Sequence, residues 1–144
     1  MQPTDIAFHF NAPNKLTYTC KLLRKATLSG ARVAVVATPE LLARLDMELW
    51  AFSPQDFIAH ASMPCSAQVR AHTPVLLCAD ASALTGYGVL VNLAEQVPQG
   101  LEGFARLIEI VTHDEADRLA ARARWKHYEA AGYTIVRHDI THAG

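Results

Sequence analysis

Apolar residues follow two periods along this chain, one typical of strands and one of helices. Residues 32–37 (RVAVVA) form a short β-branched run that suits a strand covered on both faces, whereas apolar residues recur at helical spacing from 15 to 28. Thr38 can cap the free N–H groups of a second helix, with Pro39 in its first turn. The predicted strands are residues 5–10, 32–37, 75–78, 89–93, 107–111 and 133–140, and the predicted helices are 15–28, 38–50 and 114–131, with a short helical turn at 53–58.

This alternation of strands and helices with short connections is typical of parallel βαβ units. At 144 residues the chain has the length of one ordinary domain. We therefore expect a single α/β domain over residues 1–144, with right-handed crossovers. The longest helix is expected to end before Gly132, which stands where a left-handed residue commonly terminates a helix.

Composition excludes several classes of protein. Hydrophobic residues make up 51% of the chain and charged residues 19%, which is typical of a protein that buries a core. The net charge of −1 offers no general attraction to a polyanion, so non-specific binding to duplex DNA is not expected. Three cysteines without CxxC spacing, and no apolar run of about 18 residues, predict a soluble cytoplasmic protein without a disulfide framework or a membrane span.

No motif for nucleotide or catalytic chemistry stands out. The chain has no GxxxxGK[ST] loop, and Val91 occupies the place after Gly86 and Gly88 where a dinucleotide fingerprint needs a third glycine. His138 and His142 would lie about 13 Å apart on a strand, too far to share one metal ion. No GxSxG elbow or activated cysteine suggests a nucleophile. The sequence therefore predicts no catalytic residue, cofactor or metal site.

One segment, RLAARARWKHYEAAGY at residues 118–133, concentrates cations and aromatic rings in this slightly acidic chain. On the predicted helix, Arg118, Arg122 and Lys126 form a row at i, i+4 and i+8, with Trp125 beside them. Like charges at this spacing repel slightly, and folding alone gives no reason for them. The neighbouring stripe, expected to pack against the sheet, consists of Leu119, Ala123 and Ala130.

Three interpretations of this stripe stay open on the residues alone. The first is a solvated helix surface, with the Trp125 ring shielded by arginine stems. The second is a pocket for an acidic peptide that ends in an aromatic residue, because guanidinium groups bind carboxylates in bidentate fashion. The third is a site for single-stranded nucleic acid, although one stripe on a chain without net positive charge makes a poor track.

A second candidate surface lies in residues 45–60, LDMELWAFSPQDFIAH. Its apolar side chains crowd a helix end and the following turn, where burying all of them is difficult. Core packing accounts equally well for Leu45 and Leu49. Trp50 and Phe57 are the better candidates for contact with a protein partner, since aromatic anchors dominate such interfaces.

Taken together, these two segments resemble a known family. LDxxLW followed by SPxxFIxH, then RxRWKxYxxxGY after an acidic helix start, is similar to the chi subunit of bacterial DNA polymerase III holoenzyme. The likeness extends from the first strand to Tyr133 and is weakest over residues 61–100. It implies a Rossmann-like three-layer α/β sandwich, with a mostly parallel sheet, helices on both faces and no phosphate-binding loop. It also implies two partners: the psi subunit of the clamp loader, and the acidic C-terminal tail of single-stranded DNA-binding protein.

The resemblance also assigns residues to these partners. Tail binding is implied for Arg118, Arg122, Trp125, Lys126, Tyr128 and Gly132, and psi binding for Leu49, Trp50, Phe57 and His60. Arg118 stands where the family is expected to have lysine, and Trp125 where it is expected to have tyrosine. Arginine and lysine are not equivalent at a carboxylate, so the first change bears on the affinity for the tail.

The leading hypothesis is a non-catalytic adaptor that holds the clamp loader to protein-coated single strands and contacts DNA only indirectly. A repair helicase is a further candidate partner at the aromatic surface. The alternatives are a Rossmann-type nucleotide-binding domain or small enzyme with an unrecognised site, and a protein that binds single-stranded DNA directly.

Overall fold

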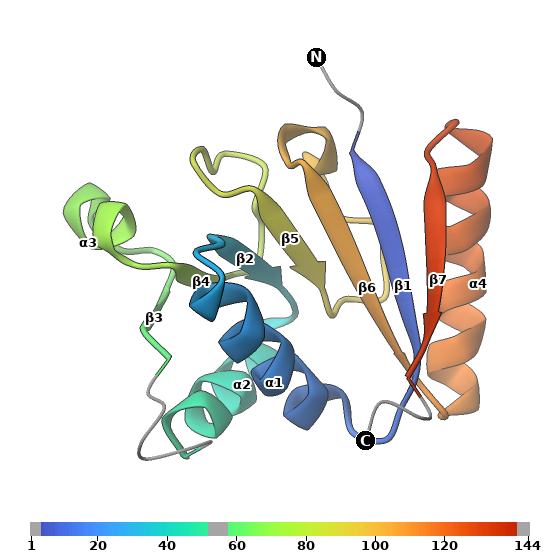
Figure 1. Ribbon diagram of the computed structural model, residues 1–144, viewed down its shortest axis with the longest axis horizontal. Helices are drawn as coiled ribbons and strands as arrows, with labels where there is room; N and C mark the ends of the chain where they lie inside the picture. Colours follow the sequence, from blue (N-terminus) through green and yellow to red (C-terminus); the bar gives the residue numbers. More distant parts are fainter. Residues whose placement is uncertain (1–3, 52–57, 141–144) are drawn as a thin grey trace.

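One parallel sheet organises the structure (Figure 1). The computed structural model describes residues 4–51 and 58–140, and within them seven strands lie in the order β3-β4-β2-β5-β6-β1-β7, with every pair parallel. The strands are β1 (Asp5–Ala12), β2 (Val33–Val36), β3 (His60–Ser62), β4 (Val75–Cys78), β5 (Val89–Asn92), β6 (Arg106–Thr112) and β7 (Ile135–Asp139). The predicted α/β class and parallel sheet are confirmed.

Helices cover both faces of this sheet. They are α1 (Lys15–Leu28), α2 (Pro39–Ala51), the short α3 (Ala67–His72), α4 (Glu115–Ala130) and a 3-10 turn η1 (Leu101–Gly103). Side-chain caps explain where two of them start: the Asn14 carbonyl oxygen accepts from the backbone of Thr17, and the Asp114 carboxylate accepts from the backbone of Asp117. The predicted turn at 53–58 lies almost entirely outside the described residues.

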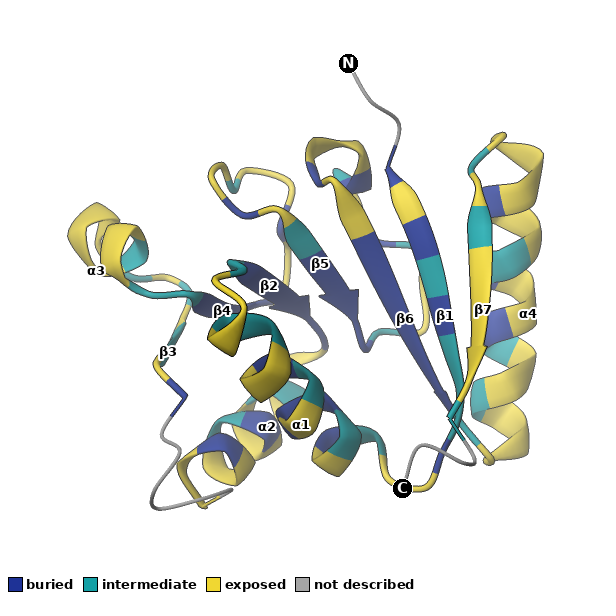
Figure 2. Cartoon of the chain, viewed as in Figure 1, coloured by how far each residue is buried: buried dark blue, intermediate teal, exposed yellow. Residues whose placement is uncertain are grey.

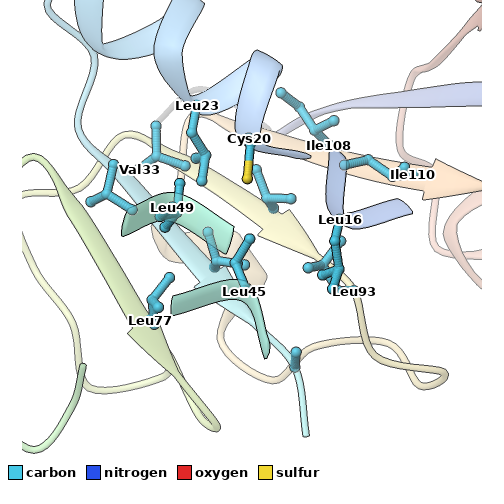
Figure 3. Close-up of a cluster of buried hydrophobic side chains, with 14 of the residues drawn as sticks. Leu16, Cys20, Leu23, Val33, Leu45, Leu49, Leu77, Leu93, Ile108 and Ile110 are labelled. Carbon is cyan, nitrogen blue, oxygen red and sulfur yellow. The ribbon is translucent and has the colours of Figure 1, made fainter. Parts of the chain in front are cut away.

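The first face of the sheet packs against α1 and α2 (Figure 1). Leu16 and Leu23 of α1 meet Leu45 and Leu49 of α2 over the central strands, and Figure 3 shows these side chains pointing into one apolar cluster. The strands β2 and β4 are buried along their whole length because each lies between two other strands and both faces of the sheet are covered there. Figure 2 shows β2 in the colour of buried residues.

The second face is covered by α4, at the end of the sheet formed by β6, β1 and β7, and by the loops that precede β5 and β6. Phe8 of β1 and Tyr128 of α4 are fully buried here, 5.9 Å apart between ring centroids. The register aligns Phe8 with Glu109 of β6 on one side and with Arg137 of β7 on the other. This row of three residues connects the core to the edge of the sheet.

The buried side of α4 differs from the prediction. Its inward residues are Ala121, Arg124 and Tyr128, whereas the expected apolar stripe (Leu119, Ala123 and Ala130) lies on the opposite side of the helix, with Leu119 63% exposed. The prediction was wrong because it chose the inward side from small apolar residues alone, whereas the side that packs against the sheet contains an arginine. Arg124 can lie inside because an acid on the sheet meets it.

That acid is Glu109, which is fully buried at the centre of a polar network. Arg124 Nε donates to Glu109 Oε1 at 3.0 Å, while Tyr128 Oη and Asn92 Nδ2 donate to Oε2 at 2.6 and 3.1 Å. Arg124 also donates to the carbonyl oxygen of Glu95 at 2.9 Å. Burial raises the pKa of Glu109, and the guanidinium and the hydrogen bonds oppose that rise. The network joins β5, β6 and α4 and fixes the rotation of the helix about its own axis.

Candidate functional site

An apolar hollow next to the basic stripe lies between α4 and the strands β1 and β7. It has a volume of about 320 Å³. Its lining combines an apolar floor with cationic walls, and consists of Phe10, Asn11, Arg118, Ala121, Arg122, Trp125, Lys126 and Arg137. We call this hollow the α4 cleft. Four of the six residues predicted for tail binding line it.

The helical wall of the α4 cleft carries three exposed cations, Arg118, Arg122 and Lys126. Among the residues that the structure describes, none of the three forms an ion pair. Glu129, one turn beyond Trp125 on the helix, accepts a hydrogen bond from the Trp125 indole at 3.3 Å. The row therefore presents its positive charge to solvent, where a bound anion can approach it.

The floor of the α4 cleft is a cluster of aromatic rings. Trp125 is half-buried, and its ring lies 4.9 Å from the Phe8 ring and 6.2 Å from the Phe10 ring, measured between centroids. Phe8 is in the core, so it supports the indole from below, while Phe10 and Trp125 reach the cleft. Rings in this arrangement offer an apolar surface to a ligand's own ring.

The opposite wall comes from the edge strand β7. Arg137 is exposed, and its guanidinium carbon lies 4.6 Å from the centre of the Phe10 ring. Sequence reasoning missed Phe10, Asn11 and Arg137. Alternation along the predicted last strand could place Arg137 on the same face as Ile135, but only the pairing of β7 with β1 shows that this face lies beside α4.

Two residues predicted for tail binding do not line the cleft. Tyr128 is fully buried and donates its hydroxyl proton to Glu109, so it supports the helix from inside. Burial and the neighbouring Glu109 carboxylate raise the pKa of Tyr128, which keeps it a neutral donor. Gly132 has a φ of 88° and lies just beyond the end of α4, where it turns the chain toward β7.

The second predicted surface is only partly exposed. Leu49 belongs to the core, and the His60 side chain is 1% exposed, with Nε2 at 3.0 Å from Asp46 Oδ1. Trp50 is 61% exposed and its ring lies 5.2 Å from the His60 ring. Met47, one turn earlier on α2 and 72% exposed, extends this surface and was missed from the sequence. Phe57 lies outside the described residues.

The comparison with known proteins identifies the family to which this chain belongs. A family model described as the DNA polymerase III chi subunit, HolC, matches residues 3–136. The chain belongs to this family. It is 30% identical over 127 residues to the chi subunit of Pseudomonas aeruginosa, covering 88% of this chain and 87% of the relative. It is 25% identical over 123 residues to the chi subunit of Haemophilus influenzae, covering 84% of each. The chain is therefore an accessory subunit of the polymerase III holoenzyme, as the sequence resemblance predicted.

Solved structures add a likeness of fold. A structure of S. cerevisiae Dbp5 bound to RNA and ADP BeF3 matches with a TM-score of 0.64 at 13% identity, over 95% of this chain and 42% of that longer chain. The C-terminal domain of Dbp5, in a structure with Gle1 and IP6, matches with a TM-score of 0.60 at 15% identity, over 97% of this chain and 92% of that one. These matches confirm the Rossmann-like arrangement of the chi family member.

The place where parallel sheets usually bind nucleotides has a different chemistry in this chi family member. A hollow of about 280 Å³ lies at the carboxyl ends of β2, β4 and β5. Asp80 is the charged residue in its described lining, and an acid opposes rather than attracts phosphate. In the described ranges, no group of three or more His, Cys, Asp or Glu side chains could hold a metal ion, and none of the helices there is long and apolar enough to cross a membrane.

Proposed function

We propose that this chain is a non-catalytic, cytoplasmic adaptor of the polymerase III clamp-loader assembly. Its α4 cleft binds the acidic C-terminal tail of single-stranded DNA-binding protein, and the exposed end of α2 binds the psi subunit. It contacts DNA only through these partners. The observation that supports the first part most strongly is the cleft itself, where cations without ion-pair partners in the described chain surround an aromatic floor.

The chemistry of such a tail suits the α4 cleft. Carboxylates accept charge-assisted hydrogen bonds from Arg118, Arg122 and Lys126, and the guanidinium groups can do so in bidentate fashion. A terminal aromatic or apolar side chain packs on Trp125 and Phe10. The cleft of about 320 Å³ accommodates a few residues of an extended chain end. A basic peptide would be repelled by the cations, and a neutral peptide would offer them no carboxylate.

The expected affinity is modest. The helical cations are exposed, so each ion pair is screened and contributes up to about 1 kcal/mol. Several such pairs with ring burial are consistent with a micromolar complex, about 8 kcal/mol in all. Added salt should weaken binding, because screening acts on exposed pairs.

Psi binding is proposed for the surface formed by Trp50 and Met47. Both side chains are large, apolar and mostly exposed on α2, and an aromatic anchor beside a flexible methionine is typical of protein interfaces. Leu49 and His60 contribute from below, since Leu49 holds the helix on the core and His60 supports the indole.

The deciding experiment is a titration of a labelled peptide with the tail sequence, followed by fluorescence anisotropy. Arg122→Ala should weaken binding about fivefold, which is about 1 kcal/mol. Arg44→Ala, which removes an exposed cation from α2 far from the cleft, should bind like the wild type. Equal affinity of the wild type and Arg122→Ala would refute the assignment. Binding of a bare single-stranded oligonucleotide at the affinity of the peptide would assign the cleft to nucleic acid instead.

A further inference from the structure

One cation of the α4 cleft does not belong to the helical row. Arg137 is on β7, the edge strand of the sheet, and faces α4 across the cleft. Strand alternation places it on the same face as Ile135, and the register aligns it with Phe8 of the aromatic floor. A ligand in the cleft would therefore have cations on two sides, which come from elements far apart in the sequence.

The fold gives Arg137 no ion pair of its own within the described ranges. The nearest acid on its strand, Asp139, accepts a hydrogen bond from Asn11 Nδ2 at 3.0 Å. Arg137 instead lies over the Phe10 ring, at 4.6 Å. This contact restricts the guanidinium without using its positive charge to neutralise an acid, and the N–H groups stay available at the cleft.

We propose that Arg137 binds a carboxylate of the acidic chain end from the strand side, so that the α4 cleft holds its ligand between two cationic walls. This inference rests on the proposed function and adds a specificity determinant to it. A single row of cations would accept an acidic chain that lies along the helix. Two facing walls require carboxylates directed both ways from the backbone, which selects a chain end with more than one carboxylate over a single anion.

Phe10 positions this residue. Because the ring limits how the guanidinium can turn, less side-chain freedom is lost when a carboxylate binds. The planar shape of the guanidinium group matters as well, because lysine at the same position would keep the charge but could not present two parallel N–H donors. Arg137→Lys should therefore recover only part of the affinity that Arg137→Ala loses.

The test is a set of binding titrations that pair protein variants with peptide variants. The proteins are wild type, Arg122→Ala, Arg137→Ala, Arg137→Lys, and Arg106→Ala as a control strand arginine outside the cleft. The peptides are the tail with all its carboxylates, the same tail with a C-terminal amide, and tails in which each acidic residue is changed to its amide. Thermal melts of each protein check that the fold is intact.

We expect Arg137→Ala to bind the full tail about five- to tenfold more weakly than wild type, and Arg106→Ala to bind it normally. At least one carboxylate of the peptide should be coupled to Arg137. Changing that carboxylate to an amide should weaken binding to the wild-type protein, but should weaken binding to Arg137→Ala much less. Two results would overturn the inference and leave the proposed function standing. In the first, Arg137→Ala loses the same affinity with every peptide; in the second, Arg137→Ala binds like the wild type while Arg122→Ala binds more weakly. Failure of the wild type to bind the tail would overturn both.

Discussion

The buried ion pair between Arg124 and Glu109 allows a quantitative test of how α4 is held. Replacing Arg124 by alanine removes the hydrogen bond to Glu109 at 3.0 Å and the one to the carbonyl oxygen of Glu95 at 2.9 Å. Glu109, which has no exposed surface, would keep two neutral donors, Asn92 and Tyr128, but would lose its only cationic partner among the described residues.

The expected loss is large because the charge left behind is fully buried. Removing one partner of a buried pair destabilises proteins by about 3–5 kcal/mol. For a chain of this length, each kcal/mol lowers Tm by about 3–4 °C, so Arg124→Ala should melt about 10–20 °C below the wild type. Tyr128→Phe is the matched control. It removes a single hydroxyl from the same carboxylate and should cost about 1–2 kcal/mol.

The loss should also depend on pH. Burial already raises the pKa of Glu109, and without the opposing guanidinium the pKa rises further. In the folded variant Glu109 then keeps a proton that the unfolded chain releases at a pH of about 4.3, so the variant loses stability as the pH rises. Urea unfolding at pH 5 and pH 8 should show a larger penalty at pH 8. A penalty below about 1.5 kcal/mol at both pH values would refute the claim that this pair holds the helix.

Two further pairs of variants test the core, the α2 surface and the glycines. Leu49→Ala should lower the free energy of unfolding by about 2–5 kcal/mol, measured by chemical unfolding, because Leu49 is buried. Trp50→Ala should lose little stability but fail to capture psi in a pull-down. Normal capture of psi by this variant would show that Trp50 is not part of that interface. Gly100 and Gly132 both have a left-handed φ, 77° and 88°, but an added Cβ at Gly100 would lie 2.6 Å from a backbone carbon while Gly132 has open space. Gly132→Ala should therefore cost about 1 kcal/mol in thermal unfolding and Gly100→Ala clearly more, and equal costs would contradict the packing at Gly100.

Much of the fold was predictable because its strongest elements have simple local causes. The run that contains β2 consists of β-branched residues flanked by turn formers, and α1 has its period and its Asn14 cap within the sequence itself. The short β3 and α3 were not predicted, since three residues of strand and the polar segment Ala67–His72 carry no clear periodicity. Their positions depend on pairing with β4 and on packing, which are properties of the whole sheet.

The candidate site was predictable on its helical side and not on its strand side. The row Arg118, Arg122 and Lys126 follows from helix geometry alone, and the structure places it on one wall of the cleft. Arg137 needs the knowledge that β7 adds next to β1 at the sheet edge, a contact between residues about 130 positions apart. Likewise, the sequence favours Trp50 over Leu49 as an interface residue but leaves the position of Leu49 open, and only the packing of α2 on the core shows that Leu49 is buried.

The rotation of α4 connects these observations. Its segment contains three arginines within seven residues, and nothing in their local sequence distinguishes the structural one from the other two. Glu109 makes the distinction, because its buried carboxylate requires the inward partner and Arg124 meets it. With Arg124 directed inward, helical geometry turns Arg118 and Arg122 toward the cleft and leaves Trp125 between core and solvent. A buried acid on β6 thus determines which cations remain available at the surface, and the tail-binding wall proposed for this chi family member depends on it.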